Sequence, residues 1–251
     1  MKSYPLAVAS LLVLSLSVHA QYASTVLDYN PGTGFAAGFT NSSAALGAPA
    51  SGAGITPFAA PFSKSQIVSI GAGGDITLQM SAPIMNSAGN AYGIDFNVFA
   101  NEFFVSSSSM VSTLFFHSAS ILVQVSQDDA TWYTLNPLLA PQAGELFPTD
   151  GKGNPEIPAN PALTLGDFMG KNLAGIESLY NGSAGGTGYD LSWALDASNQ
   201  SVDLASADYV RFEVQSGVLD LDAVSAVPEP ATWALILTGT ALAWFRLRKN
   251  K

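Results

Sequence analysis

Histidine, cysteine and the carboxylates decide which catalytic chemistry this chain can support. Between residues 21 and 226 the only histidine is His117, and the chain contains no cysteine. A Ser-His-Asp triad would therefore need His117, and no serine stands in the Gly-x-Ser-x-Gly pattern of a nucleophile elbow. Thiol catalysis, and zinc sites built on thiolates or on several histidines, are excluded. His117 itself follows two phenylalanines and is predicted to be a packed or surface side chain.

Carboxylate pairs remain, because a glycosidase needs only two acids beside a sugar bond. Segment 21–226 carries 18 acids against 4 bases, a net charge of −14, and so many acids make chance pairs that the sequence selects none. Asp220 and Asp222 are two residues apart and would share one face of a strand, where a calcium ion held with loop carbonyls could offset their repulsion. A solvated strand face is the alternative that we expect. Asp128 and Asp129 are predicted to be hairpin-turn residues.

The loop at residues 150–154 has the sequence Asp-Gly-Lys-Gly-Asn and weakly resembles a calcium-binding loop. Lys152 stands where a carboxylate or amide oxygen is needed, so a plain turn is predicted. The acidic net charge of the segment excludes nucleic acid as a partner bound through its phosphates, and it favours divalent cations or neutral glycans.

Exposed aromatic rings would provide a platform for a sugar, since pyranose faces stack on flat rings. The candidates for such a ligand site are Trp132, Tyr133 and Tyr189. Other aromatic residues available for the same role are Tyr92, Tyr180 and Trp193. Trp132 and Tyr133 are adjacent on a predicted strand, so one ring faces the core and the other faces outward. Most strand aromatics are core residues, which is the competing interpretation for each candidate.

The elements that must position these side chains are predicted to be β-strands. Clusters of Gly, Ser, Thr, Asn and Pro separate short β-prone runs, and no long helical periodicity occurs between residues 21 and 226. Apolar residues alternate with polar ones at Ile121, Val123 and Val125, and again in 209–214. The predicted strands are 67–70, 75–80, 93–100, 120–126, 131–135, 209–214 and 219–224.

These strands predict an all-β sandwich that forms one domain over residues 21–226. The segment between the strands 120–126 and 131–135 is predicted to be a hairpin turn. A long loop is expected over 137–165, and a short helix within 168–180. Without disulfides, such a domain depends on its hydrophobic core.

The beginning of the chain has the composition of a targeting segment. Lys2 supplies a positive charge, 5–18 is apolar, and small residues around Ala20 suit a signal peptidase. Residues 1–20 are therefore predicted to be a signal-peptide helix that engages the export machinery and is removed, which leaves Gln21 first. A buried N-terminal core helix is the alternative.

Residues 227–251 carry three ordered features. The first is the motif Val227, Pro228, Glu229 and Pro230. The second is the apolar stretch 231–245, at the start of a predicted short transmembrane helix over 231–247, and the third is the set of basic residues Arg246, Arg248, Lys249 and Lys251. Fifteen residues at ~1.5 Å each span about 22 Å, less than a hydrocarbon core of ~30 Å, so insertion requires bilayer thinning and snorkelling of the basic side chains. The one-sided positive charge predicts a cytoplasmic tail, and a plain membrane anchor is the alternative.

This tripartite tail resembles the PEP-CTERM sorting signal of Gram-negative bacteria, which exosortase, a membrane transpeptidase-like enzyme, is thought to process. The resemblance covers about 25 residues. It implies transient anchoring in the inner membrane, cleavage near the motif, and delivery to the cell surface, the outer envelope or the extracellular space, often beside exopolysaccharide. The two prolines hold the motif extended and stop a helix from propagating into it, which would give a protease an accessible backbone.

A second resemblance covers much of the middle of the chain. The stretches that carry it are 73–78, 83–84, 95–101, 123–128, 132–133, 185–191, 209–211 and 220–224. They are similar to bacterial secreted surface proteins with a jelly-roll sandwich like that of galactose-binding, carbohydrate-binding modules. That resemblance implies a jelly-roll-like β-sandwich between the signal peptide and the membrane helix.

The resemblance also directs attention to particular acids. Those proteins usually have a glutamate at the position of Ala100, so a ligand or metal site that uses it is either absent here or served by Glu102. Asp95, Asp190 and Asp222 lie in stretches that carry the resemblance, and they are the candidates for a metal site, with calcium as the ion, or for a structural acid cluster.

Three functions follow as hypotheses. The preferred one is a non-catalytic cell-surface or extracellular-matrix protein, processed by exosortase and binding glycan in association with exopolysaccharide or a biofilm. The second is a carboxylate-dependent polysaccharide hydrolase. The third is a purely structural adhesin or biofilm component.

Overall fold

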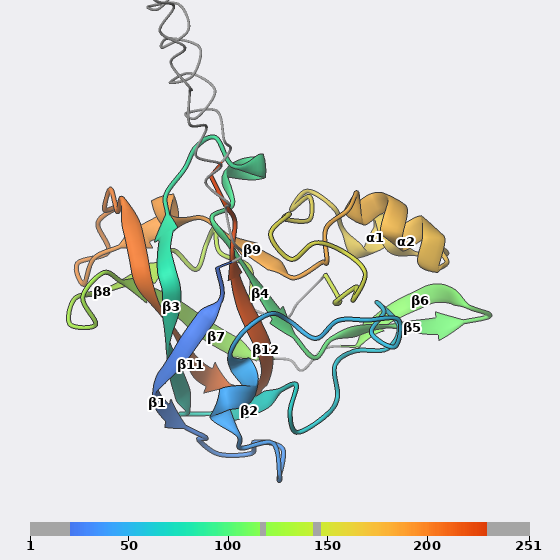
Figure 1. Ribbon diagram of the computed structural model, residues 1–251, viewed down its shortest axis with the longest axis horizontal. Coiled ribbons are helices and arrows are strands. Elements are labelled where there is room, and N and C mark those ends of the chain that lie inside the picture. The colour runs from blue at the N-terminus through green and yellow to red at the C-terminus, as the bar shows by residue number, and fades with distance from the viewer. Residues whose placement is uncertain (1–20, 116–118, 143–146, 230–251) are drawn as a thin grey trace, which may run out of the picture.

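Two antiparallel sheets form a sandwich, and a smaller lobe lies beside it (Figure 1). The computed structural model describes residues 21–115, 119–142 and 147–229. The sandwich strands are β1 (Ala23–Asn30), β2 (Val68–Gly71), β3 (Asp75–Met85), β4 (Phe96–Ala100), β7 (Ser120–Ser126), β8 (Trp132–Leu135), β9 (Thr187–Tyr189), β10 (Ala194–Leu195), β11 (Ser206–Ser216) and β12 (Val218–Ala226). The larger sheet has the order β1-β3-β11-β7-β8-β10, and the smaller has β2-β12-β4-β9. The predicted all-β sandwich is confirmed.

Alternation of side chains places an apolar layer between the sheets. Ile121, Val123 and Val125 are buried, as their spacing predicts. Phe212 of β11 pairs with Val123 on one side and with Ile76 on the other, so three strands contribute one row of the core. Because each strand presents every second residue to the same face, short runs with a period of two are enough to build this layer.

The predicted strands all occur, but the sequence missed several others. β1 is an edge strand with mostly exposed residues and two register irregularities, so it lacks a regular apolar alternation. β9 and β10 have only three and two residues, too few for a periodic pattern. The hairpin turn between β7 and β8 is confirmed, because these strands pair antiparallel, with Gln124 opposite Thr134 and Ser126 opposite Trp132.

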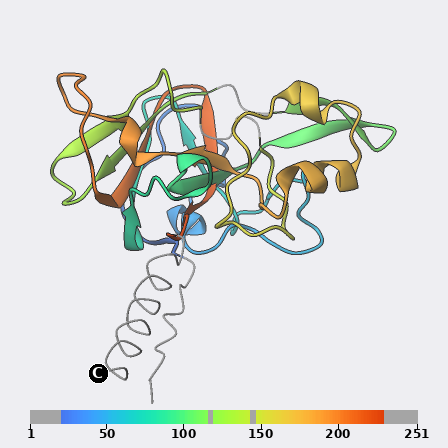
Figure 2. The same cartoon turned by 90° about the horizontal axis from the view of Figure 1, so that it is seen from above.

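The side lobe lies beside the sandwich and contains both α-helices of the described residues. It comprises β5 (Phe103–Ser107), β6 (Met110–Phe115), α1 (Leu165–Phe168), α2 (Leu173–Tyr180) and the loop residues 147–164. Figures 1 and 2 show α1, α2 and the β5–β6 hairpin together on one side of the sandwich. Short 3-10 turns occur elsewhere, at Ser42–Ala45, Ala91–Gly93 and Leu191–Trp193.

Aromatic rings hold the side lobe together. Phe168 lies at the centre, with its ring 4.9 Å from that of Phe104, 5.9 Å from that of Tyr180 and 6.2 Å from that of Phe147. Such tilted and edge-on pairs are favourable beyond the area that they bury. The lobe therefore has a small core of its own, separate from the aliphatic layer of the sandwich.

Capping residues explain where the short helix forms. Asn172 accepts a hydrogen bond from the Gly175 N–H at 3.0 Å, and Asn181 ends α2 in the left-handed conformation. The helix predicted within 168–180 is therefore confirmed at Leu173–Tyr180, after a break at Gly170, which has a φ of +71°.

The two ends of the sandwich lie side by side. The Ala226 N–H donates to the Gln21 carbonyl at 2.8 Å, and the Val227 N–H donates to the backbone carbonyl of Asp95 at 2.8 Å. After this last bond the chain becomes exposed at Glu229. The predicted signal peptide (1–20), Pro230, the membrane helix 231–247, the basic tail and His117 lie outside the described residues. In the part of the chain that is described, no helix is long and apolar enough to cross a membrane.

Candidate functional site

A cavity of about 550 Å³ lies where the loop 56–62 meets the beginning of the side lobe. We call it the junction cavity. Its apolar walls are Ala36, Phe58, Ala59, Ala60, Phe62 and Phe103, and its polar members are Asn101 and Asp220. The volume and the mixture of many apolar groups with few polar ones are typical of small-molecule sites.

Backbone hydrogen bonds and two prolines shape the loop that forms one wall. Thr56 and Ala59 bond each other in a tight turn, at 3.1 and 2.8 Å. The Pro57 carbonyl accepts the Phe104 N–H at 2.7 Å, and the Pro61 carbonyl accepts the side-chain amide of Asn101. Because proline has no N–H to give to a sheet, this loop docks on the lobe through its carbonyl groups instead of extending a strand.

The rim of the junction cavity is open to solvent. Phe62 is 70% exposed although it is a large apolar side chain. Its ring lies 5.3 Å from that of Phe39, which supports it from one side. An exposed, supported aromatic ring at a cavity mouth is available to a ligand.

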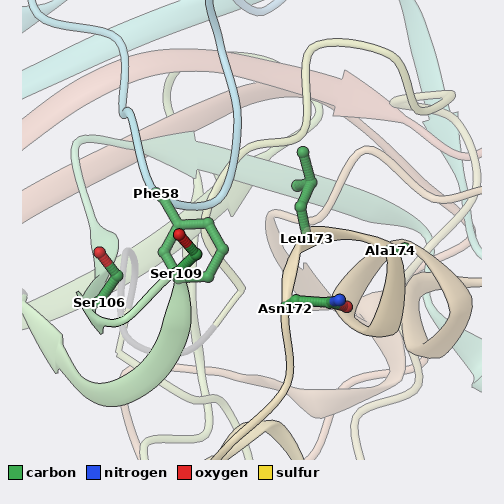
Figure 3. A pocket seen from close by; sticks show the side chains of 6 residues that line it. All are labelled: Phe58, Ser106, Ser109, Asn172, Leu173 and Ala174. Atoms are coloured by element: carbon green, nitrogen blue, oxygen red, sulfur yellow. The ribbon is translucent and has the colours of Figure 1, made fainter.

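A second cavity, of about 340 Å³, adjoins the first and is called the lobe cavity. Figure 3 shows Phe58 between the β5–β6 hairpin, which contributes Ser106 and Ser109, and the start of α2, which contributes Asn172, Leu173 and Ala174. Phe58 lines both cavities. The two spaces therefore share one aromatic wall.

The hairpin that borders the lobe cavity has an unfavourable turn sequence. Ser107 pairs with Met110, so Ser108 and Ser109 alone form the turn. Both have positive φ, of 52° and 62°, as a type I′ turn requires. Asn-Gly is the favoured sequence for this turn, and each non-glycine residue held at positive φ costs on the order of 1 kcal/mol. Such strain beside a cavity is typical of functional loops.

Buried carboxylates lie between the smaller sheet and the side lobe. Glu102 is 1% exposed, and its Oε1 has no hydrogen-bond partner among the described residues. Burial, with a smaller contribution from the Asp222 charge, raises the pKa of Glu102 to about 8. Burial also raises the pKa of Asp222 to about 7, although both of its oxygens accept the Ala50 N–H, at 3.2 and 2.9 Å.

These carboxylates correct one expectation from the sequence. Asp220 and Asp222 do share strand β12, but they are 5% and 2% exposed, so the expected solvated strand face is wrong. Asp220 lines the junction cavity, and Asp222 lies close enough to Glu102 for their charges to interact. Glu102, which the second resemblance indicated as an alternative site residue, is thus beside these acids.

The acids predicted to form one metal cluster are not together. Burial raises the pKa of Asp95 to about 6, with a smaller contribution from the charge of the nearby Asp190. Phe96 pairs with Ala226, four residues along β12 from Asp222, which is about 13 Å at ~3.3 Å per residue. Asp95 instead accepts hydrogen bonds from protein donors, including the N–H groups of Leu191 and Ser87 at 2.9 and 3.0 Å.

The predicted cluster of Asp95, Asp190 and Asp222 is therefore corrected to a structural pair near β9 and a separate acid near Glu102. Among the residues that the structure describes, no group of three or more His, Cys, Asp or Glu side chains has the arrangement of a metal site. The sequence 150–154 forms a turn, as predicted, with the Asp150 carboxylate accepting the Lys152 N–H at 3.1 Å.

The predicted aromatic platform is also divided. Tyr189 is fully buried, stacks on Phe96 at 5.3 Å and donates to the Pro141 carbonyl, so it is a core residue and not a ligand contact. Tyr133 packs against the sandwich core. Trp132 faces outward, as the strand alternation predicts for one of the pair, and the Arg211 guanidinium lies 4.2 Å from its ring centre.

Sequence reasoning missed the aromatic walls of the cavities. Phe58, Phe62 and Phe103 lie in segments that have no strand periodicity or that border a serine-rich stretch, so they gave no signal as a site. The available signal was the sequence Pro-Phe-Ala-Ala-Pro-Phe at residues 57–62, in which prolines hold two phenylalanines outside regular structure.

Comparison with known proteins adds no assignment. No protein-family model matches the chain. No curated protein is significantly similar to it in sequence.

Proposed function

We propose that this chain is an exported, non-catalytic protein of the cell surface or extracellular matrix, with a jelly-roll-like domain that binds a glycan chain along its side lobe. The observation that carries the proposal is that Phe58 lines both the junction cavity and the lobe cavity. A polymer with repeating units could place neighbouring units on the two sides of this ring.

The chemistry of the walls supports a sugar. Aromatic rings stack on the apolar faces of pyranoses, while hydroxyl and amide side chains bond their hydroxyl groups. The junction cavity offers Phe62 and Asn101, and the lobe cavity offers Ser106, Ser109 and Asn172. Few polar groups among many apolar ones fix the orientation of a ligand.

The jelly-roll assignment is supported by how the chain crosses between sheets. β1, β3 and β11 belong to the larger sheet, while β2, β4 and β12 belong to the smaller one. Repeated crossing of this kind is typical of Greek-key and jelly-roll sandwiches.

Export and processing by exosortase form the other part of the proposal. The last strand ends at Ala226, and the Val227 N–H donates to the Asp95 carbonyl, before Pro228 and the exposed Glu229. Cleavage near the motif would therefore leave the sandwich hydrogen bonds intact. Fusing residues 227–251 to a passive exported reporter tests this: processing that does not depend on exosortase would contradict it.

A carboxylate-dependent hydrolase is the second candidate, because Glu102 is held protonated near neutral pH beside Asp222. A general acid needs such a raised pKa. Glu102 does not line either cavity, however, and at 1% exposed it is out of reach of a polymer. Binding without release of reducing ends is therefore expected.

The test is a titration of the purified full chain with a panel of oligosaccharides by calorimetry, together with an assay for reducing ends. Phe58→Ala is expected to weaken binding roughly tenfold or more, since stacking on both sides of the ring is lost. Trp132→Ala is the matched control, because its ring lies on the outer face of the larger sheet, away from both cavities. Equal affinity of Phe58→Ala and the unmodified chain would remove the basis of the proposal.

A further inference from the structure

We propose that the end of the sandwich where β12 finishes lies against the lipid bilayer, with Tyr92 among the lipid headgroups, while the chain is anchored in the inner membrane. This inference rests on the export and anchoring part of the proposed function, and it names the surface that faces the membrane. It is carried by the short distance between the last strand and the apolar stretch 231–245, and by the loop beside that strand.

The sandwich holds the chain up to a point close to the apolar stretch. The Val227 N–H donates to the Asp95 carbonyl at 2.8 Å, and the apolar stretch begins at Ala231. Four steps from residue to residue, at ~3.3–3.6 Å each, span at most about 14 Å. A domain attached so closely cannot move far from a bilayer that this stretch enters, so this end of the sandwich faces the headgroups.

The loop between β3 and β4 lies at the same end of the sandwich as the end of β12 (Figure 1). Asp95, which is fully buried, holds both segments. Its carboxylate accepts the Ser87 N–H at 3.0 Å and the side-chain amide of Asn90 at 2.9 Å, while its backbone carbonyl accepts the Val227 N–H. One buried residue therefore fixes the loop relative to the point where the chain leaves the sandwich.

This loop presents an aromatic ring to solvent. Tyr92 is 56% exposed, lies in the short 3-10 turn Ala91–Gly93 and has a φ of +61°. A non-glycine residue is strained in this conformation, and such strain persists where the surrounding structure holds it, commonly at functional positions. Met85, where β3 ends, is 43% exposed. Tyrosine is enriched where a membrane meets water, because its ring is apolar and its hydroxyl group is polar.

Charge distinguishes the loop from the rest of this acidic domain. Residues 76–94 contain no Asp, Glu, Lys, Arg or His, although segment 21–226 has a net charge of −14. Anionic lipids repel an acidic surface, so an uncharged loop with an exposed ring is suited to close approach. A basic protein partner would instead bind where the acids are exposed. The loop therefore fits a lipid surface better than a basic protein.

Fluorescence quenching measures the proposed contact in the full chain, reconstituted in vesicles of phosphatidylethanolamine and phosphatidylglycerol. The chain has no cysteine, so Ala91→Cys or Ser216→Cys provides a unique site for a fluorophore. Ser216 is the matched control, because it lies at the opposite end of β11 from Ser206, which pairs with Met85. Lipids with a nitroxide on the headgroup are expected to quench the fluorophore at position 91 roughly threefold or more strongly than at position 216.

A second substitution separates contact through the ring from mere proximity. Tyr92→Ser, added to Ala91→Cys, is expected to lower the quenching at position 91 roughly twofold, because the side chain that enters the headgroup region is lost. Leu138→Ser, at an apolar residue that is 92% exposed, is the control and should leave the quenching unchanged. Raising sodium chloride should not weaken the quenching, since the contact does not depend on charge.

The outcomes separate this inference from the function on which it rests. Equal quenching at positions 91 and 216 in vesicles that carry the chain would overturn the membrane-facing end. Quenching at position 91 that Tyr92→Ser leaves unchanged would overturn the assignment to Tyr92. Quenching that occurs only when exosortase is present in the vesicles would show that a protein, and not lipid, contacts the loop. Failure of the chain to float with the vesicles would instead overturn the anchoring part of the proposed function.

Discussion

The interior of the sandwich and the junction between the sandwich and the side lobe are built differently. The sandwich interior is a layer of aliphatic and aromatic side chains such as Ile76, Val125 and Phe212. At the junction, buried polar and acidic side chains accumulate, with Glu102 and Asp222 forming no ion pair among the described residues. Burying a carboxyl group without a counter-charge disfavours its ionised form, which is why the pKa values of Glu102 and Asp222 are raised.

The comparison therefore separates two tasks within one fold. The apolar layer stabilises the sandwich and needs no ligand. At the junction, buried carboxyl groups lie near two cavities, a strained hairpin and the exposed ring of Phe62. Removing a buried ring from the sandwich core should lower the free energy of unfolding, whereas removing a buried ionisable group from the junction should raise it.

The largest effect is expected in the sandwich core. Phe212→Ala should lower the free energy of unfolding by about 3–5 kcal/mol, because it removes a fully buried ring and leaves a cavity. Urea unfolding followed by circular dichroism measures this loss. Phe58→Ala is the control from the junction, since Phe58 is only half-buried. A loss as large as that of Phe212→Ala would contradict the distinction between the regions.

Replacing the ionisable group of Glu102 should raise the free energy of unfolding at alkaline pH. Glu102 has a pKa of about 8 in the folded protein, above the ordinary value of 4.5, so the folded state binds more protons between these values. Its contribution to stability is complete below about pH 4.5 and is lost as pH rises toward 8. Glu102→Gln cannot ionise, so at pH 8 it should be more stable than the unmodified chain, on the order of 3 kcal/mol, with little difference near pH 4.5.

Urea unfolding at several pH values between 4.5 and 8 measures this difference. Glu213→Gln, at a half-exposed position on the larger sheet, is the matched control. Should both variants change the pH dependence equally, the effect would come from net charge and not from the buried site.

The outer face of the larger sheet should show a smaller effect. Trp132→Ala removes a ring that lies 4.2 Å from the Arg211 guanidinium, and should lower the free energy of unfolding by about 1 kcal/mol. Thermal unfolding measures it. A loss of several kcal/mol would place Trp132 with the core residues.

The smallest effect is expected to be an increase in the free energy of unfolding when the strain in the β5–β6 hairpin is relieved. Ser109→Gly should raise the free energy of unfolding by about 0.5–1 kcal/mol, because glycine adopts positive φ without steric cost. Ser112→Gly, within β6, is the control and should be destabilising. A gain at both positions would show that the turn is not the source of strain.

The sequence predicted the sandwich better than it predicted the site. Alternation at Ile121, Val123 and Val125 requires only local information, so strand β7 was predicted with its observed bounds. The pairing of Phe58 with Ser109 and Asn172 depends on three segments distant in the chain, and no local pattern reports it. Burial of Asp222 was equally hidden, because whether a strand face is covered depends on how the lobe packs.

Hydrogen–deuterium exchange of the full chain, with and without a saturating oligosaccharide from the calorimetric panel, tests the central claim most directly. Binding at the junction predicts increased protection in three segments: 56–62, 101–109 and 172–174. The outer strands around Trp132 and Arg211 should not change. Protection confined to that outer face, with the three segments unaffected, would contradict a binding site between the sandwich and the side lobe.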